Sequence, residues 1–142
     1  MREITFNAER ISLPGINQDK VRKWLEAVAQ RHDKIIGEIN YMFTDDDGIL
    51  KINREFLQHD YYTDIITFDY SKRRVISGDI YISLDTVRSN AENLGETYDR
   101  ELHRVIIHGV LHLVGINDKG PGEREIMENF ENEALEILQR ME

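Results

Sequence analysis

One short stretch constrains the fold more strongly than any other part of the sequence. Between Val105 and Val114 every residue is apolar or glycine, except for two histidines. Thr97 or Asp99 offers a helix N-cap before this stretch, and Gly115 offers a stop after it. A helix that is apolar around most of its circumference belongs inside a core. We therefore expect a helix over 99–115 that the rest of the chain covers.

The rest of the chain alternates between strand-like and helix-like patterns. Alternating apolar residues and β-branched runs predict strands over 2–6, 34–43, 65–70 and 74–83. The last two strands form a hairpin. Three- and four-residue apolar spacing predicts further helices over 17–31, 46–57, 85–93 and 123–140. The inner positions expected in the helices over 46–57 and 123–140 are Ile49, Ile52, Phe56, Leu57, Ile126, Phe130, Leu135 and Leu138.

This order of elements indicates an α+β fold. We expect one metal-hydrolase-like domain over residues 1–142, in which about five helices pack on a small mixed sheet of about four strands. The buried helix over 99–115 then carries the candidate site, which is described next.

Composition excludes several classes of protein. The 142 residues have a net charge of −9 and include no cysteine, which excludes disulfide frameworks and cysteine nucleophiles. We find no apolar run of bilayer-spanning length and no signal peptide, so we expect a cytoplasmic location without membrane association. An acidic chain does not adhere broadly to nucleic acid, and RNA binding would require locally clustered cations. We expect a positive groove that leads to the candidate site.

The two histidines of the apolar stretch are candidates for metal binding. His108 and His112 are four residues apart, so they lie on the same face of a helix. Burial of two unpartnered imidazoles is costly, and a shared divalent ion would remove that cost. The alternative is that both are hydrogen-bonded core residues. Gly109 replaces the glutamate of the His-Glu-x-x-His zinc peptidases, so we expect no peptidase of that type.

A catalytic metal site needs a third protein ligand, and it keeps one position open for water. Gly115 lets the chain turn back after the helix, which places 116–119 near the histidines. Asp118 is the best metal ligand among these four residues, although it could instead cap the next helix. On these residues alone, the sequence predicts a metal-dependent hydrolase.

Three blocks of sequence resemble the YbeY family of bacterial metal-dependent endoribonucleases. HGVLHLVGIND (108–118) is similar to the family pattern His-Gly-x-Leu-His-Leu-x-Gly-Tyr-Asp-His. INREFLQHDYYTDIITF (52–68) and GDIYIS (78–83) resemble two upstream family segments, in the same order and with the same spacing. The residues that the first of these upstream segments shares with the family are Asn53, Asp60, Thr63, Asp64 and Phe68.

The resemblance implies an endonuclease that hydrolyses phosphodiester bonds of single-stranded RNA in ribosomal RNA maturation and ribosome quality control. It implies one divalent ion, expected to be zinc, at His108, His112 and Asp118. The implied partners are ribosomal RNA precursors and ribosomal subunits or assembly proteins. One alternative is a ribosome-assembly factor with a mainly structural ion and negligible cleavage. A hydrolase of small substrates is a third possibility.

The chain departs from the family pattern at two functional positions. Asp118 stands where the family has its third histidine, so a loaded site would carry one unit less of positive charge. Leu57 stands where the family has a functional arginine, and leucine cannot bind phosphate. No group is assigned to proton transfer. The candidates for RNA contact, or for support of the metal ligands, are Arg54, His59, Asp64 and Lys119.

Overall fold

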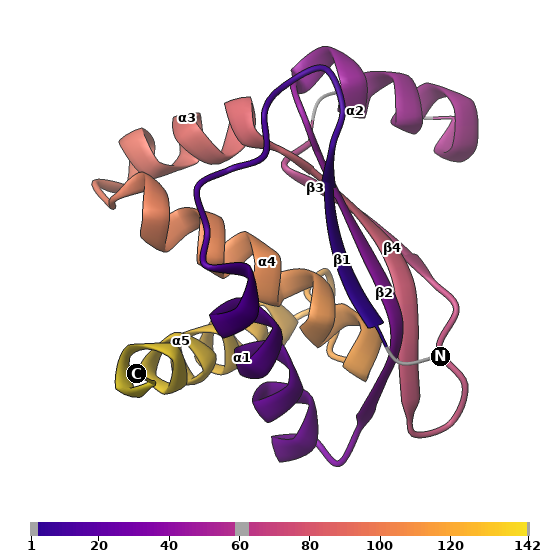
Figure 1. The fold of residues 1–142 in the computed structure, drawn as a ribbon, viewed down its shortest axis with the longest axis vertical. Coiled ribbons are helices and arrows are strands. Elements are labelled where there is room, and N and C mark those ends of the chain that lie inside the picture. Colours follow the sequence, from indigo (N-terminus) through magenta and orange to yellow (C-terminus); the bar gives the residue numbers. More distant parts are fainter. Residues whose placement is uncertain (1–2, 59–62, 142) are drawn as a thin grey trace.

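The computed structural model describes residues 3–58 and 63–141, which form an α+β fold (Figure 1). Within these residues, four strands and five α-helices confirm the expected fold class. The elements in chain order are β1 (Glu3–Ala8), α1 (Gln18–Arg31), β2 (Ile35–Thr44), α2 (Asp46–Ile52), the π-helix η1 (Asn53–Leu57), β3 (Ile65–Asp69), β4 (Val75–Ser83), α3 (Leu84–Leu94), α4 (Tyr98–Val114) and α5 (Glu123–Arg140).

The sheet is mixed, and its strand order is β1-β2-β4-β3. The pairs β1–β2 and β2–β4 are parallel, whereas β3 and β4 form the expected antiparallel hairpin. Strand β1 continues beyond the expected end at residue 6, because Asn7 and Ala8 pair with Met42 and Phe43 of β2. Strand β3 is an edge strand of this sheet, and it contacts α4.

Helix α4 packs directly on one face of the sheet. A Cβ atom at Gly109 would lie 2.8 Å from Ile80 Cδ1 of β4, so the helix backbone approaches the strand as closely as glycine permits. Tyr41 of β2 donates a hydrogen bond of 2.8 Å to the Ile106 carbonyl of α4. Helices α1, α3 and α5 also contact α4, and Figure 1 shows α1, α4 and α5 on the same side of the sheet.

The ends of α4 follow the sequence signals. Thr97 is the N-cap, and its hydroxyl accepts a hydrogen bond of 3.1 Å from the Arg100 backbone N–H. Gly115 ends the helix with φ of 114°, a left-handed conformation that residues with a Cβ rarely adopt. Within residues 3–58 and 63–141, neither α4 nor any other helix is long and apolar enough to cross a membrane.

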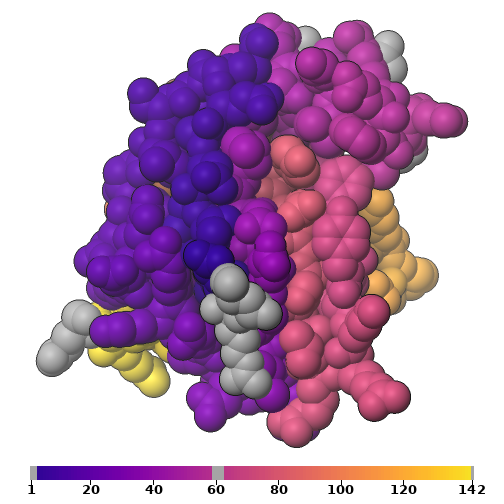
Figure 2. Space-filling model, turned by 45° about the vertical axis from the view of Figure 1, so that its right-hand side comes forward, coloured from indigo at the N-terminus to yellow at the C-terminus, as the bar shows by residue number. Residues whose placement is uncertain are grey.

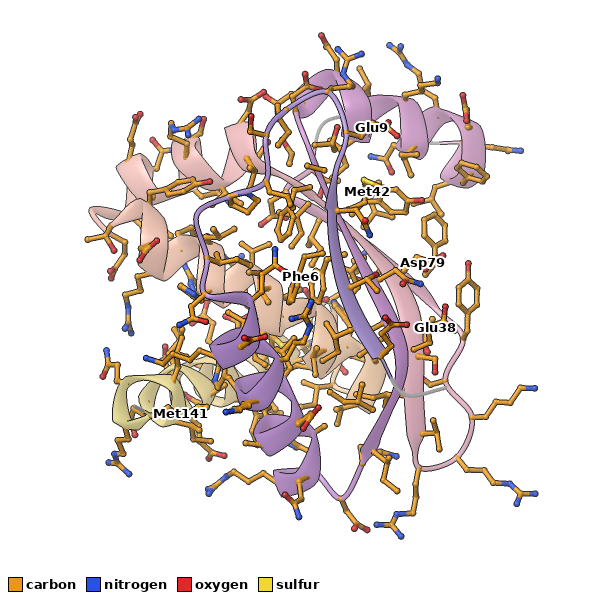
Figure 3. The ribbon with its side chains drawn as sticks, in the orientation of Figure 1. Phe6, Glu9, Glu38, Met42, Asp79 and Met141 are labelled. Atoms are coloured by element: carbon orange, nitrogen blue, oxygen red, sulfur yellow. The ribbon has the colours of Figure 1, made fainter. Side chains whose placement is uncertain are left out.

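The opposite face of the sheet carries polar and acidic side chains. Thr5, Asn40 and Asp79 form a hydrogen-bonded row across β1, β2 and β4, with lengths of 2.6 and 3.1 Å. Figure 2 shows strand residues of this face at the surface of the molecule, side by side. In Figure 3, Glu38 and Asp79 lie on this side of the strands, whereas Phe6 lies on the side of the helices.

The expected buried positions are partly wrong for the segment over 46–57 and for α5. Helix α2 ends at Ile52, and the following π-helix leaves Phe56 62% and Leu57 39% exposed. A π-helical turn contains more residues than an α-helical turn, so the residues after Ile52 no longer follow α-helical spacing. In α5, Ile126 is 51% exposed and its neighbour Met127 is buried instead, whereas the expected Leu135 is buried and Phe130 and Leu138 pack against the core.

Candidate metal centre

The three predicted ligands lie together at the C-terminal end of α4. His108 and His112 project from the same face of the helix, and Asp118 lies in the loop that follows Gly115. One potential ligand atom from each of the three residues lies within 4.8 Å of the other two. The histidine Nε2 atoms are 3.3 Å (His108) and 3.5 Å (His112) from the two oxygens of Asp118.

These distances fit the donor set of one divalent ion. Ligand atoms about 2.0–2.1 Å from a tetrahedral ion lie about 3.4 Å from one another. The separations of 3.3 and 3.5 Å, each to a different oxygen of Asp118, are close to that spacing, and one ligand atom from each of the three residues lies within 4.8 Å of the other two. Two imidazole nitrogens and a carboxylate oxygen also form a donor set that zinc accepts. The residues present therefore suit a divalent cation.

The group opens into a cleft of about 820 Å³. The side chains of His108, His112 and Asp118 are 18%, 30% and 24% exposed, so they are partly buried but accessible from solvent. Strand β3 and helices α3, α4 and α5 contribute the walls of the cleft, together with part of the loop after α4. An accessible position beside the three donors is what a catalytic site requires, whereas structural metal sites are closed.

The two histidines differ in what surrounds them. His108 Nδ1 is hydrogen-bonded to the buried carboxylate of Glu131 at 2.5 Å. Burial is the largest single effect on the pKa of His108 and lowers it, but the hydrogen bond to Glu131 and the negative charges of Glu131, Asp118 and Asp64 together raise the pKa above its ordinary value. Burial, together with the nearby charge of His108, lowers the pKa of His112. Among the described residues, His112 Nδ1 has no hydrogen-bond partner comparable to Glu131.

Comparison with known proteins identifies the family. The family profile described as Endoribonuclease YbeY matches residues 3–139. A protein named Endoribonuclease YbeY from Phocaeicola vulgatus is 60% identical over 135 residues, which cover 95% of this chain and 98% of that protein. Proteins with the same name are 61% identical in Parabacteroides distasonis (95% of each chain) and 55% identical in Porphyromonas gingivalis (98% of this chain and 92% of that protein). This chain belongs to the YbeY endoribonuclease family.

A solved structure has a similar fold. The solution structure of a Thermotoga maritima protein superposes with a TM-score of 0.63 at 25% identity, covering 96% of this chain and 92% of that one. The superposition covers nearly the whole length of both chains, so it supports the observed fold.

Two of the four supporting candidates line the cleft. Asp64 precedes β3, and its carboxylate accepts a hydrogen bond of 3.3 Å from Asn90 of α3. Burial raises the pKa of Asp64. Lys119 follows Asp118 in the cleft wall, near enough to His112 for its positive charge to contribute to the lowered pKa of that histidine.

The other two candidates have different positions. Arg54 is exposed on η1 and does not belong to the cleft lining. His59 lies outside the residues that the structure describes. Leu57, at the position of the YbeY family arginine, does line the cleft.

The charges along the cleft correct one expectation. The described lining carries three cationic side chains, from Arg104, Lys119 and Arg124. It carries twice as many carboxyl groups, from Asp64, Asp69, Glu101, Asp118, Glu128 and Glu131. The expected positive groove is therefore wrong for this part of the chain, because acidic residues of β3, α4 and α5 converge on the site. Positive charge near the histidines would come mainly from a bound cation and from Lys119.

Sequence reasoning missed Glu131. Glu131 lies on α5, 23 residues after His108 in the sequence, and no local motif connects the two residues. A signal was nevertheless present. Glu131 occupies an inner position of α5, four residues after the buried Met127 and three before the buried Ala134. A carboxylate on an apolar face of a helix is seldom buried without a partner.

Proposed function

We propose that this chain is a metal-dependent endoribonuclease that hydrolyses single-stranded RNA in ribosomal RNA maturation and ribosome quality control. The observation that carries the proposal is the group formed by His108, His112 and Asp118, whose spacing suits one divalent ion and which opens into a cleft. Membership of the YbeY family supports RNA as the substrate, since the relatives are named as endoribonucleases.

The finer features of the proposal follow from the site and from the family. Zinc is the proposed ion, because two imidazoles and one carboxylate form a donor set typical of catalytic zinc. We place the activity in one domain over residues 1–142 and in the cytoplasm. The proposed partners are ribosomal RNA precursors and ribosomal subunits or assembly proteins.

Five side chains of the cleft have separate roles in this proposal. His108 and His112 would hold the ion through Nε2, and Asp118 would hold it through a carboxylate oxygen. When bound, a divalent ion supplies Lewis acidity toward a phosphodiester oxygen and toward water. Lys119 would attract the phosphate group with its ammonium nitrogen. Asp64, which Asn90 orients, would shape the opposite wall.

The alternative function is a role without RNA cleavage. Leu57 lines the cleft at the position of the family arginine, and carboxyl groups outnumber cations in the lining. Both observations favour a ribosome-assembly factor in which the ion is mainly structural. The open cleft argues against this alternative, because structural ions are enclosed by four protein ligands.

Cleavage of single-stranded RNA by the purified protein tests the proposal. We expect cleavage that stops when a chelator removes the ion and returns when zinc is added back. His112→Ala should abolish cleavage, because it removes one of three ligands. His103→Ala is the matched control, since His103 lies on the same helix outside the group and bonds to the Asp99 carbonyl. Cleavage that survives both chelation and His112→Ala contradicts the proposal.

A further inference from the structure

The second ring nitrogen of His108 reveals a further functional residue. A neutral imidazole has one nitrogen that donates a hydrogen bond and one that accepts, so a ligand nitrogen must be the one without the hydrogen. His108 Nε2 faces Asp118, whereas Nδ1 faces Glu131. An ionised carboxylate can only accept a hydrogen bond, so the contact with Glu131 places the hydrogen on Nδ1. That choice leaves the lone pair of Nε2 directed toward the proposed ion.

Glu131 is itself held rigidly. Glu131 is only 4% exposed, and its Oε1 atom, the oxygen that does not contact His108, lies 3.6 Å from the Arg104 guanidinium of α4. Arg104 also binds Glu101, at 2.5 Å through one terminal nitrogen and 3.1 Å through Nε. The guanidinium therefore lies between two buried carboxylates, one on its own helix and one on α5.

The spacing on α4 explains why these groups meet. Glu101, Arg104 and His108 are three and four residues apart, so they share the helix face that packs on α5. Glu131 approaches this face from the middle of α5, between the buried Met127 and Ala134. If Arg104 moved away, the buried carboxylate of Glu131 would lose its cationic partner, and an unpaired buried charge is costly.

We propose that Glu131 is a positioning residue for the metal site: through its hydrogen bond to Nδ1 it fixes the tautomer and the ring orientation of His108, and Arg104 holds it in place. The inference rests on the proposed function, because it concerns the same ion. It also makes the two histidines unequal, since no such partner orients His112 among the described residues.

The test compares Glu131→Ala and Glu131→Gln with Glu133→Gln. Glu133 lies on the same helix, but it is only partly buried and pairs with Arg31 instead. The first readout uses metal-free protein at a pH above the raised pKa of His108, where the ring is neutral: nitrogen-15 NMR of the imidazoles reports which ring nitrogen of each histidine carries the hydrogen. We expect Nδ1–H at His108 in the unmodified protein and in Glu133→Gln. In Glu131→Ala we expect a mixture of tautomers at His108, while the His112 signal stays unchanged.

The second readout is the dissociation constant for Co²⁺ or Zn²⁺, measured by competition with a chelator. Loss of a carboxylate behind a histidine ligand weakens metal binding about 10- to 100-fold. We expect a weakening in this range for both Glu131 variants and none for Glu133→Gln. Glu131→Gln conserves volume, so it remains informative if Glu131→Ala does not fold.

The possible outcomes separate this inference from the proposed function. Wild-type tautomer and metal affinity in folded Glu131 variants would overturn the positioning role, even if the protein cleaves RNA. If instead the unmodified protein binds no divalent ion, the proposed function fails. The tautomer measurement would still show whether Glu131 orients His108, because it needs no metal and no activity.

Discussion

A single methyl group at Gly109 should disturb the metal centre without touching any of its proposed ligands. A Cβ atom there would lie 2.8 Å from Ile80 Cδ1 and 3.3 Å from Ile65 Cδ1, both closer than ordinary van der Waals contact. Ile80 is fully buried, so its terminal carbon has little space into which it can move. We therefore expect Gly109→Ala to displace α4 from the sheet, and His108 and His112 with it.

Two opposing effects determine the magnitude of this change. Alanine is favoured over glycine in a helix interior by about 1 kcal/mol. An added carbon in a well-packed core costs about 1–3 kcal/mol. The expected result is a net loss of about 1 kcal/mol in the free energy of unfolding, which corresponds to about 4 °C in Tm for a chain of this length.

Thermal unfolding of the metal-free protein measures the effect, and a Co²⁺ titration measures the coupled loss of metal affinity. Gly15→Ala is the matched control. A Cβ atom at Gly15 meets nothing within 4 Å, so this variant should be neutral or slightly stabilised. A Gly109→Ala variant that is more stable than the unmodified protein would refute the reasoning, because it would show that β4 does not hold α4 at this position.

Three further predictions concern the charges of the cleft. The affinity for a divalent ion should fall in titrations from about pH 8 to about pH 5.5, because the proton competes with the ion. As the pH falls, His108 should become protonated before His112, because the pKa of His108 is raised and that of His112 is lowered. Protonation of His108 should therefore weaken metal binding first. Burial raises the pKa of Asp64, so its charged form destabilises the fold as pH rises above the ordinary aspartate range. Asp64→Asn should therefore increase Tm of the metal-free protein at about pH 7 and leave it unchanged below about pH 3. Lys119→Ala should raise KM for RNA and reduce by about one the number of counterions released on RNA binding, as read from the salt dependence of the affinity. Lys23 is exposed and lies outside the cleft, so Lys23→Ala should change neither quantity.

Much of the fold was predictable because local patterns and tertiary packing agree. The N-cap at Thr97, the stop at Gly115 and the apolar stretch between them define α4 without any structural information. The close approach at Gly109 could also be inferred, since glycine inside a helix has a cost that packing must justify. Where apolar spacing alone was used, as for Phe56 and Ile126, tertiary structure decided otherwise.

The candidate site was predictable only as far as one stretch of chain determines it. His108, His112 and Asp118 lie within eleven consecutive residues, so helical geometry and one turn suffice to bring them together. Glu131 comes from another helix, and its contact with His108 depends on how α5 packs on α4. The charge of the cleft depends in the same way on elements far apart in the sequence, which is why short motifs did not predict it.

The metal content of purified Asp118→Ala tests the central claim most directly, with Asn117→Ala as the control from the same cleft wall. If Asp118 replaces a histidine as the third ligand, the unmodified protein and Asn117→Ala hold one divalent ion per chain. Asp118→Ala would then lose the ion and the cleavage of RNA together. An Asp118→Ala variant that keeps one tightly bound ion would contradict the account, because the site would then be formed without Asp118.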